Sequence, residues 1–462
     1  MIGVTFAMAM ATTALSSPVV PSDEQIRKII SDRIDIRDDS LGIVIGVIDP
    51  SGQRIIAYGR YGRDDARPVD GDTIFEIGSV TKTFTALLLA DMVAKGEASL
   101  ADPVAKYLPS HAAPLERADK AITLRDLATQ TSGLPRLPDN LTPASLENPY
   151  ADYTKEHFYA FLSKHRLTRD IGVEYEYSNL GFGLLGHALA LNADVRDADA
   201  SYETLVRNRI TTPLGMDSTG ITLSPDRKAR LAGAHDEKLQ PVSHWDMPVF
   251  VGAGAMRSSA LDMLAFLAVP LGYKQMPLTQ AFTTMSATRF PLDAETDVAL
   301  GWMIDKSMGD EVVWHNGGTG GHRAFVGYRL KTGVGIVVLS NAGGAMGVDD
   351  IGLHLLNADF PLAKPAAERK TIEVAADRLN AYVGRYQLAP DFVLTITREE
   401  NRLFAQATGQ SKAEIYPESE TEFFLKVVEA RIVFVPGPDG GQASRLILLQ
   451  GGQAMPAERL GD

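Results

Sequence analysis

The sequence predicts an α+β protein. A mixed or antiparallel sheet is flanked by helices and lies beside a helical lobe, and a small all-β barrel-like domain follows at the C-terminus. Strand-like runs occur at both ends of the first 360 residues, with helical patterns between them. After residue 375, short strand-like runs separated by turn residues dominate. The length of 462 residues agrees with two or three domains.

Two hairpins are expected in the first domain. β-branched residues fill residues 41–49 and recur in 54–60, and a Pro-Ser-Gly turn lies between these runs. A second pair of strands is expected at 322–330 and 334–340, joined by Lys331-Thr332-Gly333. Because strands open and close this region, we expect one sheet built from both ends of the domain.

The helices are expected between these hairpins. The most apolar pattern runs from Ser79 to Lys95, and Gly96 directly after it is typical of a helix end. Shorter helical patterns occupy residues 124–129, 180–191 and 259–267. These helices would cover the sheet and form the helical lobe.

The chain divides into four predicted segments: 1–22, 23–360, 361–375 and 376–462. Residues 1–22 carry no charged side chain, and Ala9-Met10-Ala11 is similar to a signal-peptide cleavage site. This predicts export to the periplasm or out of the cell, although the segment lacks the usual basic start. A cytoplasmic protein with an apolar tail is the alternative. Residues 361–375 are interpreted as a linker, and 376–462 as an all-β barrel or sandwich.

Composition excludes several classes of function. The sequence has no cysteine, which excludes disulfides, thiol nucleophiles and thiolate metal sites. Acidic residues number 58 and basic residues 45, for a net charge of −13, and no Lys/Arg run occurs. Nucleic acid is therefore not an expected partner. No apolar run reaches the length of a membrane span.

The sequence predicts no metal and no cofactor. The nine histidines are scattered, no H-E-x-x-H occurs, and no dinucleotide fingerprint is present. His235 and His244 are interpreted as structural or loop residues rather than as metal ligands. The absence of G-x-S-x-G argues against an α/β-hydrolase.

Gly78-Ser79-Val80-Thr81-Lys82 is the most informative motif. Ser79 precedes an apolar helix, and Lys82 lies three residues later on the same face. Burial at the start of such a helix would lower the pKa of Lys82, which suits its amine to take a proton from a hydroxyl. The alternative is a serine that caps the helix and a surface lysine whose stem covers apolar side chains.

Two further motifs hold candidate polar groups. Tyr177 and Asn179 point the same way if their segment is extended, so that the tyrosine could relay a proton and the asparagine could orient the lysine. An aromatic core residue followed by a helix cap is the alternative. Residues 314–322 (WHNGGTGGH) precede a strand, and their glycines would allow close approach to the backbone and an oxyanion hole. A flexible turn is the alternative there.

In this order, the three motifs resemble those of the serine β-lactamase and penicillin-binding-protein superfamily. The branch that resembles this sequence most holds class C β-lactamases, D-Ala-D-Ala carboxypeptidases, D-aminopeptidases and related esterases. The similarity covers about residues 25 to 360 and implies the β-lactamase-like fold. Four stretches carry it: FEIGSVTKTFTALLLADMVAKGEASLADPVAKYLP, ITLRDLATQTSGLP, YEYSNLGFGLLG and WHNGGTGGHRAFVGY.

The resemblance implies a role for each matched residue. Ser79 would be the nucleophile, Lys82 its base, Tyr177 a proton relay, and Asn179 a group that orients the lysine and the substrate. His315 would then stand where the family usually has lysine. The resemblance places Asn316 and Gly317 at the substrate, and the N–H groups of Ser79 and Gly318 in the oxyanion hole.

Lys331-Thr332-Gly333 is a second candidate, besides His315, for the position where the family usually has lysine. It lies between two strand-like runs, so we interpret it as a hairpin tip far from Gly317. A histidine at 315 is mostly neutral at pH 7, whereas lysine is charged. The site should therefore favour carboxylate-bearing substrates less than a lysine enzyme does.

These observations predict a serine hydrolase that acts on a small-molecule or short-peptide substrate. Ser79 would attack an ester, amide or β-lactam carbonyl and form an acyl-enzyme. An esterase or peptidase is the leading hypothesis, and a β-lactamase or D-Ala-D-Ala carboxypeptidase is the alternative. A non-hydrolytic receptor for penicillin or peptide is the alternative from another class.

Overall fold

A computed structural model describes residues 20–461, except for nine short stretches. These are 110–114, 194–197, 345–346, 364–370, 390–391, 409–411, 427–429, 438–440 and 451–452. Residues 1–19 of the predicted export segment and residues 364–370 of the predicted linker therefore lie outside the described residues. The chain forms two compact units, Met1–Ala363 and Lys364–Asp462.

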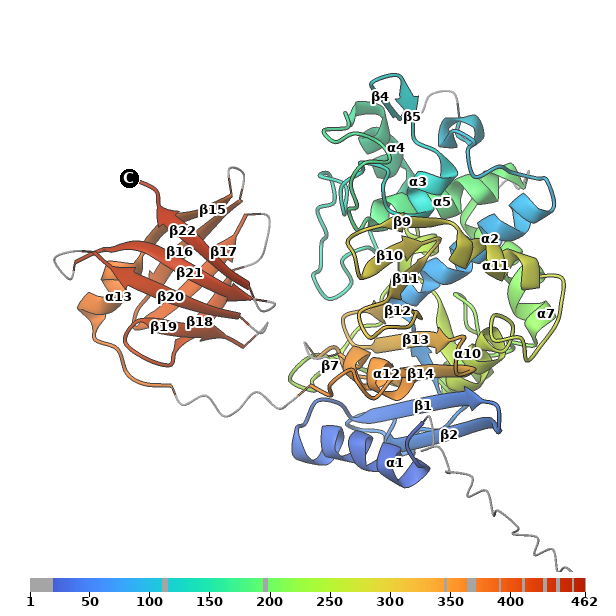
Figure 1. The fold of residues 1–462 in the computed structure, drawn as a ribbon, viewed down its shortest axis with the longest axis horizontal. Coiled ribbons are helices and arrows are strands. Elements are labelled where there is room, and N and C mark those ends of the chain that lie inside the picture. Colours follow the sequence, from blue (N-terminus) through green and yellow to red (C-terminus); the bar gives the residue numbers. More distant parts are fainter. Residues whose placement is uncertain are drawn as a thin grey trace, which may run out of the picture. The chain divides into compact units, whose positions relative to one another are not determined.

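An eight-stranded antiparallel sheet organises the first unit (Figure 1). Its order is β2-β1-β14-β13-β12-β11-β10-β9. The first strand pairs with the last, Ile45 opposite Val338, so both ends of the domain build one sheet, as predicted. The strands are β1 Gly42–Asp49, β2 Gly52–Gly59, β9 Arg289–Pro291, β10 Thr296–Ala299, β11 Trp302–Asp305, β12 Val312–Gly318, β13 Arg323–Arg329 and β14 Val334–Ser340.

Both faces of this sheet are covered, which explains why β1 is apolar at successive positions. Val44 and Ile48 point into the larger core, which also contains α10 (Ala260–Leu267). Ile43, Ile45 and Val47 face the other way, into a second core shared with α1 (Asp23–Ser31) and α12 (Asp349–Leu356).

The other helices pack on the larger core or form the helical lobe. They are α2 Thr81–Ala94, α3 Leu124–Ala128, α4 Lys155–Lys164, α5 Asn179–Asn192, α6 Ala198–Val206, α7 Thr212–Leu214, α8 Pro225–Ala229, α9 Val251–Gly254 and α11 Thr279–Ala287. Three small ribbons complete the unit: β3 Ile74–Glu76 with β8 Arg257–Ser259, β4 Glu116–Arg117 with β5 Lys120–Ala121, and β6 Ala234–His235 with β7 Pro241–Val242. No helix of the described residues is long and apolar enough to cross a membrane.

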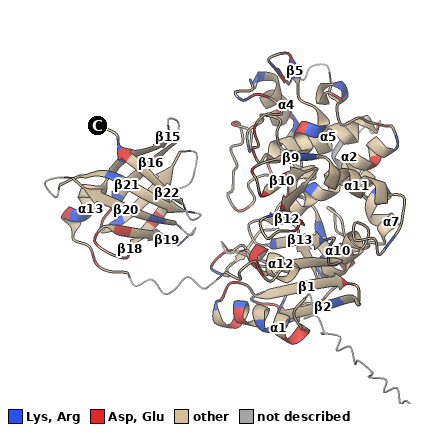
Figure 2. Cartoon of the chain, in the orientation of Figure 1, with Lys and Arg blue, Asp and Glu red and all other residues tan. Residues whose placement is uncertain are grey.

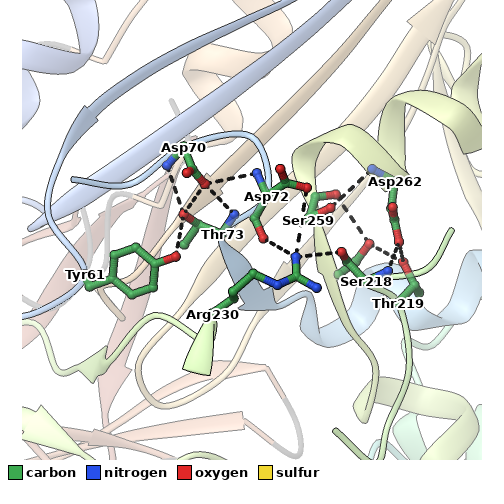
Figure 3. Close-up of polar contacts among 10 residues, drawn as sticks. Tyr61, Asp70, Asp72, Thr73, Ser218, Thr219, Arg230, Ser259 and Asp262 are labelled. Atoms are coloured by element: carbon green, nitrogen blue, oxygen red, sulfur yellow. Dashed lines mark hydrogen bonds and ion pairs between the residues drawn. The ribbon is translucent and has the colours of Figure 1, made fainter. Parts of the chain in front are cut away.

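A polar network holds the segment that enters β3 (Figure 3). The Thr73 hydroxyl donates to Asp70 at 2.8 Å, and Arg230 donates to the backbone oxygen of Asp72 at 2.9 Å. Arg230 also donates to the hydroxyl of Ser218 at 2.8 Å. The buried carboxylate of Asp262 on α10 accepts the N–H of Ser218 at 2.8 Å. Segments far apart in sequence thus fix the strand that leads to Ser79.

The second unit is a closed eight-stranded barrel, which agrees with the predicted all-β domain. Tyr382 from α13 (Ala376–Tyr382) stacks on Phe434 inside it, with ring centroids 4.3 Å apart. Its strands are β15 Gly384–Ala389, β16 Phe392–Glu399, β17 Arg402–Ala407, β18 Ala413–Pro417, β19 Glu422–Leu425, β20 Ala430–Pro436, β21 Ala443–Gln450 and β22 Gln453–Arg459. Acidic and basic residues are interspersed in both units (Figure 2).

Candidate active site

Ser79 lies at the junction of β3 and α2. The sequence predicted that it begins the helix, but the structure places it in a separate 3-10 turn, Gly78–Val80, before Thr81. Gly78 adopts a left-handed φ of 48°, which turns the chain sharply before the serine. Ser79 is partly exposed, as a nucleophile must be, whereas the next helical turn is buried.

Lys82 is fully buried, and its amine contacts three oxygen atoms. Nζ lies 3.0 Å from Ser79 Oγ, 2.8 Å from Asn179 Oδ1 and 2.7 Å from the backbone oxygen of Ala253. Burial lowers its pKa well below the ordinary value, and the charge of Arg136 lowers it further. A surface lysine with a solvated head, the alternative at this position, is therefore wrong.

Lys82 Nζ donates to three oxygen atoms, those of Ser79, Asn179 and Ala253. Because the pKa of Lys82 is lowered, the amine can lose a proton, and its lone pair is then available to the Ser79 hydroxyl while Asn179 and Ala253 accept its two remaining hydrogens. This is the arrangement that a general base requires.

Tyr177 and Asn179 come from the segment that enters α5. Ser178 caps this helix by accepting the N–H of Gly181, which brings both neighbours toward Ser79. The Tyr177 hydroxyl donates to Ser79 Oγ at 2.5 Å. Burial raises the pKa of Tyr177, so its phenol keeps its proton at neutral pH.

The glycine motif begins inside the sheet. The motif precedes strand β13, as predicted, and its residues 314–318 also form the end of β12, a strand that the sequence did not predict. A Cβ atom on Gly317 would lie 1.9 Å from the backbone oxygen of Ile77 and 3.0 Å from the Ser79 nitrogen. Only glycine allows β12 to reach the Ser79 turn. The Gly318 backbone lies against Gly78, where a Cβ would come within 2.6 Å of the Gly318 nitrogen.

His315 and Asn316 point to opposite faces of β12. His315 is buried on the face of Lys82, and its Nδ1–H donates to the backbone oxygen of Asn316 at 2.5 Å. Burial is the largest cause that lowers the pKa of His315 to about 3, and the protonated form of Lys82 contributes to the same shift, so the imidazole is neutral. The Asn316 side chain donates to Asp349 at 2.5 Å on the other face. Asn316 can therefore contact the substrate only through its backbone atoms.

Lys331 lies in the tight turn between β13 and β14, as predicted for a hairpin tip. Gly333 in this turn has a φ of 68° and contacts Tyr273. The literal Lys-Thr-Gly is therefore structural.

Two groups near Ser79 were missed by the sequence analysis. One is the backbone oxygen of Ala253, for which no side-chain motif exists. The other is Arg136, whose guanidinium carbon lies 4.9 Å from the ring centroid of Tyr177. Arg136 is exposed, and no carboxylate of the described chain forms an ion pair with it. It follows the TSGLP stretch directly, which is a signal that could have found it.

Comparison with known proteins identifies the family to which this chain belongs. The beta-lactamase family model matches residues 26–358, and a domain of unknown function, DUF3471, matches residues 368–455. The chain therefore belongs to the beta-lactamase family. It is a serine hydrolase of that family, and the family alone does not specify the subtype.

The relatives include beta-lactamases and a penicillin-binding protein. A beta-lactamase of Pseudomonas fluorescens is 27% identical over 66% of this chain and 89% of its own. Penicillin-binding protein 4* of Bacillus subtilis is 25% identical over 87% of this chain and 91% of its own. A solved class C beta-lactamase from Rhodobacter sphaeroides is 25% identical, with a TM-score of 0.60, over 69% of this chain and 94% of that one.

Proposed function

We propose that this protein hydrolyses an ester or amide carbonyl through an acyl-enzyme on Ser79. The observation that carries the proposal is the buried amine of Lys82, which lies 3.0 Å from Ser79 Oγ and is held there by hydrogen bonds to Asn179 and Ala253. A buried lysine that formed no part of a reaction would be costly to retain.

Each proton transfer has a donor and an acceptor. As Ser79 Oγ bonds to the carbonyl carbon, its proton passes to Lys82 Nζ, and the backbone N–H groups of Ser79 and Gly318 stabilise the oxyanion. Tyr177 gives its proton to the leaving group and regains one from Lys82. The carbon–leaving-group bond breaks and leaves the ester of Ser79. Water then attacks this ester and gives its proton to Lys82 Nζ, with the Tyr177 hydroxyl as the relay, and a proton returns from Lys82 to Ser79 Oγ as the bond between the carbonyl carbon and Oγ breaks.

The neutral His315 supports an esterase or peptidase subtype. A lysine at this position would offer a fixed charge to a substrate carboxylate, whereas the imidazole offers a neutral hydrogen-bonding group. The second candidate is a β-lactamase or D-Ala-D-Ala carboxypeptidase. Arg136 favours that reading, because its unpaired guanidinium next to Tyr177 could bind a carboxylate instead.

Active-site labelling tests the proposal. A fluorophosphonate or a fluorescent penicillin should label the wild type and not Ser79→Ala, while the matched control Ser163→Ala on α4 should label normally. Equal labelling of Ser79→Ala would refute the role of Ser79. Many turnovers of a p-nitrophenyl ester per enzyme molecule would exclude a receptor that acylates once.

We also propose that the protein is exported, because residues 1–22 are apolar and uncharged. Cell fractionation followed by mass determination of the mature N-terminus tests this. Full-length protein confined to the cytoplasm would contradict it.

A further inference from the structure

A second polar cluster lies beside the candidate active site. It consists of Glu76 on β3, His244 on the segment after β7, and His322 at the end of the glycine motif. Each residue offers one ligand atom, and these three atoms lie within 4.8 Å of one another. The histidine rings stack, with centroids 5.4 Å apart.

The cluster contains buried polar atoms that the protein itself does not satisfy. Glu76 Oε2 and both ring nitrogens of His322 have no hydrogen-bond partner, and His244 Nδ1 has only a long contact of 3.5 Å with Glu76 Oε1. His322 is fully buried, and Glu76 is 3% exposed. Buried polar atoms are nearly always paired, and each unpaired one costs about 1–3 kcal/mol. An ion or a water molecule could bind these atoms.

We propose that Glu76, His244 and His322 bind a divalent transition-metal ion, with Zn²⁺ as the best fit. Two imidazoles and one carboxylate form a common set of three zinc ligands, which leaves a fourth position for water. Mg²⁺ and Ca²⁺ prefer oxygen ligands and do not match two histidines. The His244 side chain is 31% exposed, so an ion can enter from its side.

Arg257 prepares the carboxylate of Glu76 for this role. Its Nη2 donates to Glu76 Oε1 at 3.1 Å, and the backbone N–H of Trp245 donates to the same oxygen at 3.0 Å. The other oxygen, Oε2, is left for the ion. Such outer hydrogen bonds orient the ligands of metal sites. Because Arg257 offsets the charge of Glu76, the ion would keep most of its own charge and bind an acidic water.

The ion would connect three segments around Ser79. Glu76 precedes Ser79 by three residues, and the backbone oxygen of His322 accepts the N–H of Thr319, next to Gly318, at 3.1 Å. Metal binding would therefore stabilise the strand that carries the nucleophile and the glycine segment together. The inference does not depend on the proposed reaction.

Metal binding by the full chain tests the proposal. After chelator treatment and removal of the chelator, titration calorimetry with Zn²⁺ should show one equivalent bound, and Co²⁺ should give the visible absorption of a coordinated ion. His244→Ala should weaken Zn²⁺ binding by roughly 100-fold or more. The matched control His157→Ala removes an exposed imidazole on α4 and should bind as the wild type does.

His322→Gln is a second variant, which replaces a buried ligand. Its circular dichroism and unfolding midpoint show whether this variant folds. If it does not fold, the result for His244→Ala, whose side chain is partly exposed, decides whether the site binds Zn²⁺. Zn²⁺ should also raise the unfolding midpoint of the wild type and not that of His244→Ala. Absence of Zn²⁺ binding, or equal binding by His244→Ala and His157→Ala, would overturn the proposal.

Discussion

The amine of Lys82 lies 2.7 Å from the backbone oxygen of Ala253, on a helix more than 160 residues away in sequence. This contact depends on the close approach of α9 to α5. A Cβ atom on Gly252 would lie 3.0 Å from the Cα of Gly186 and 2.9 Å from the backbone oxygen of Phe182. The two helices therefore place a carbonyl group where it accepts one hydrogen of the lysine amine and holds this amine beside Ser79.

Lys82→Met should slow acylation by about 10²–10⁴-fold, the usual contribution of a general base. The thioether side chain fills most of the space but accepts no proton. The measurement is the rate of label incorporation at saturating probe, with Lys95→Met on the exposed end of α2 as the control. An unchanged rate in Lys82→Met would remove this amine from the mechanism.

Tyr177→Phe should lower the turnover number and leave the fold intact. The substitution keeps the ring against Arg136 and removes the hydroxyl that donates to Ser79. Pre-steady-state kinetics on a p-nitrophenyl ester separate acylation from deacylation, and both steps should slow by about 10²-fold or more. Tyr159→Phe on α4 serves as the control. Wild-type kinetics in Tyr177→Phe would exclude the relay.

Arg136→Gln should shift the pH profile of kcat/KM. The positive charge of Arg136 lowers the pKa of Lys82, so its removal raises that pKa. The acidic limb, along which Lys82 loses its proton, then moves to higher pH. Arg125→Gln on α3 is a matched control that removes an exposed guanidinium elsewhere. Coincident acidic limbs for Arg136→Gln and the wild type would show that Arg136 does not act on Lys82.

Much of the fold could be predicted because its signals are local. The hairpin of β1 and β2, the apolar helix after Ser79 and the turn at 331–333 each occupy one continuous stretch. Strands β9, β10 and β11 were not predicted. They have three or four residues each, too few for an alternating pattern, and pairing with neighbouring strands holds them in the sheet.

The candidate site was predictable only where side chains carry the chemistry. Ser79, Lys82, Tyr177 and Asn179 belong to short motifs, and the structure brings these four into contact. The carbonyl oxygen of Ala253 belongs to the backbone, and the alanine side chain has no polar group. No sequence pattern therefore predicts its role. The sequence analysis interpreted His244 as a structural or loop residue, and it could not group this residue with Glu76 and His322. The three proposed ligands are separated by more than 70 residues and meet only through the fold.

Asp349→Asn should stabilise the protein at alkaline pH. Burial raises the pKa of Asp349 from 3.8 to about 6, so the folded state disfavours its charged form. The free energy of unfolding of the wild type should therefore fall by up to about 3 kcal/mol as the pH rises from 3.8 to about 6 and beyond. An asparagine still accepts the hydrogen bond from Asn316 without the charge.

Urea unfolding measures this effect near pH 8 and near pH 4. The gain of Asp349→Asn should be large at the higher pH and close to zero at the lower one. Asp226→Asn, exposed in the first turn of α8, is the control and should show little difference at either pH. A gain that is equal at both values would mean that ionisation of Asp349 is not its source.

His315→Lys tests what determines the substrate preference. His315 has a pKa of about 3 and stays neutral across the working range, so it cannot attract a carboxylate by charge. The new lysine should raise the ratio of kcat/KM for a carboxylate-bearing substrate to that for a neutral ester about tenfold, equivalent to about 1.4 kcal/mol. His157→Lys on the surface of α4 is the matched control.

The substitution His315→Lys should also change the pKa of the general base, Lys82. A second cation on the face of Lys82 lowers the pKa of Lys82, so the acidic limb of kcat/KM moves to lower pH, opposite to the shift expected for Arg136→Gln. If His315→Lys moves the limb but leaves the substrate ratio unchanged, the charge reaches Lys82 and not the substrate. The carboxylate of such substrates would then be bound elsewhere, and Arg136 is the cation to replace next.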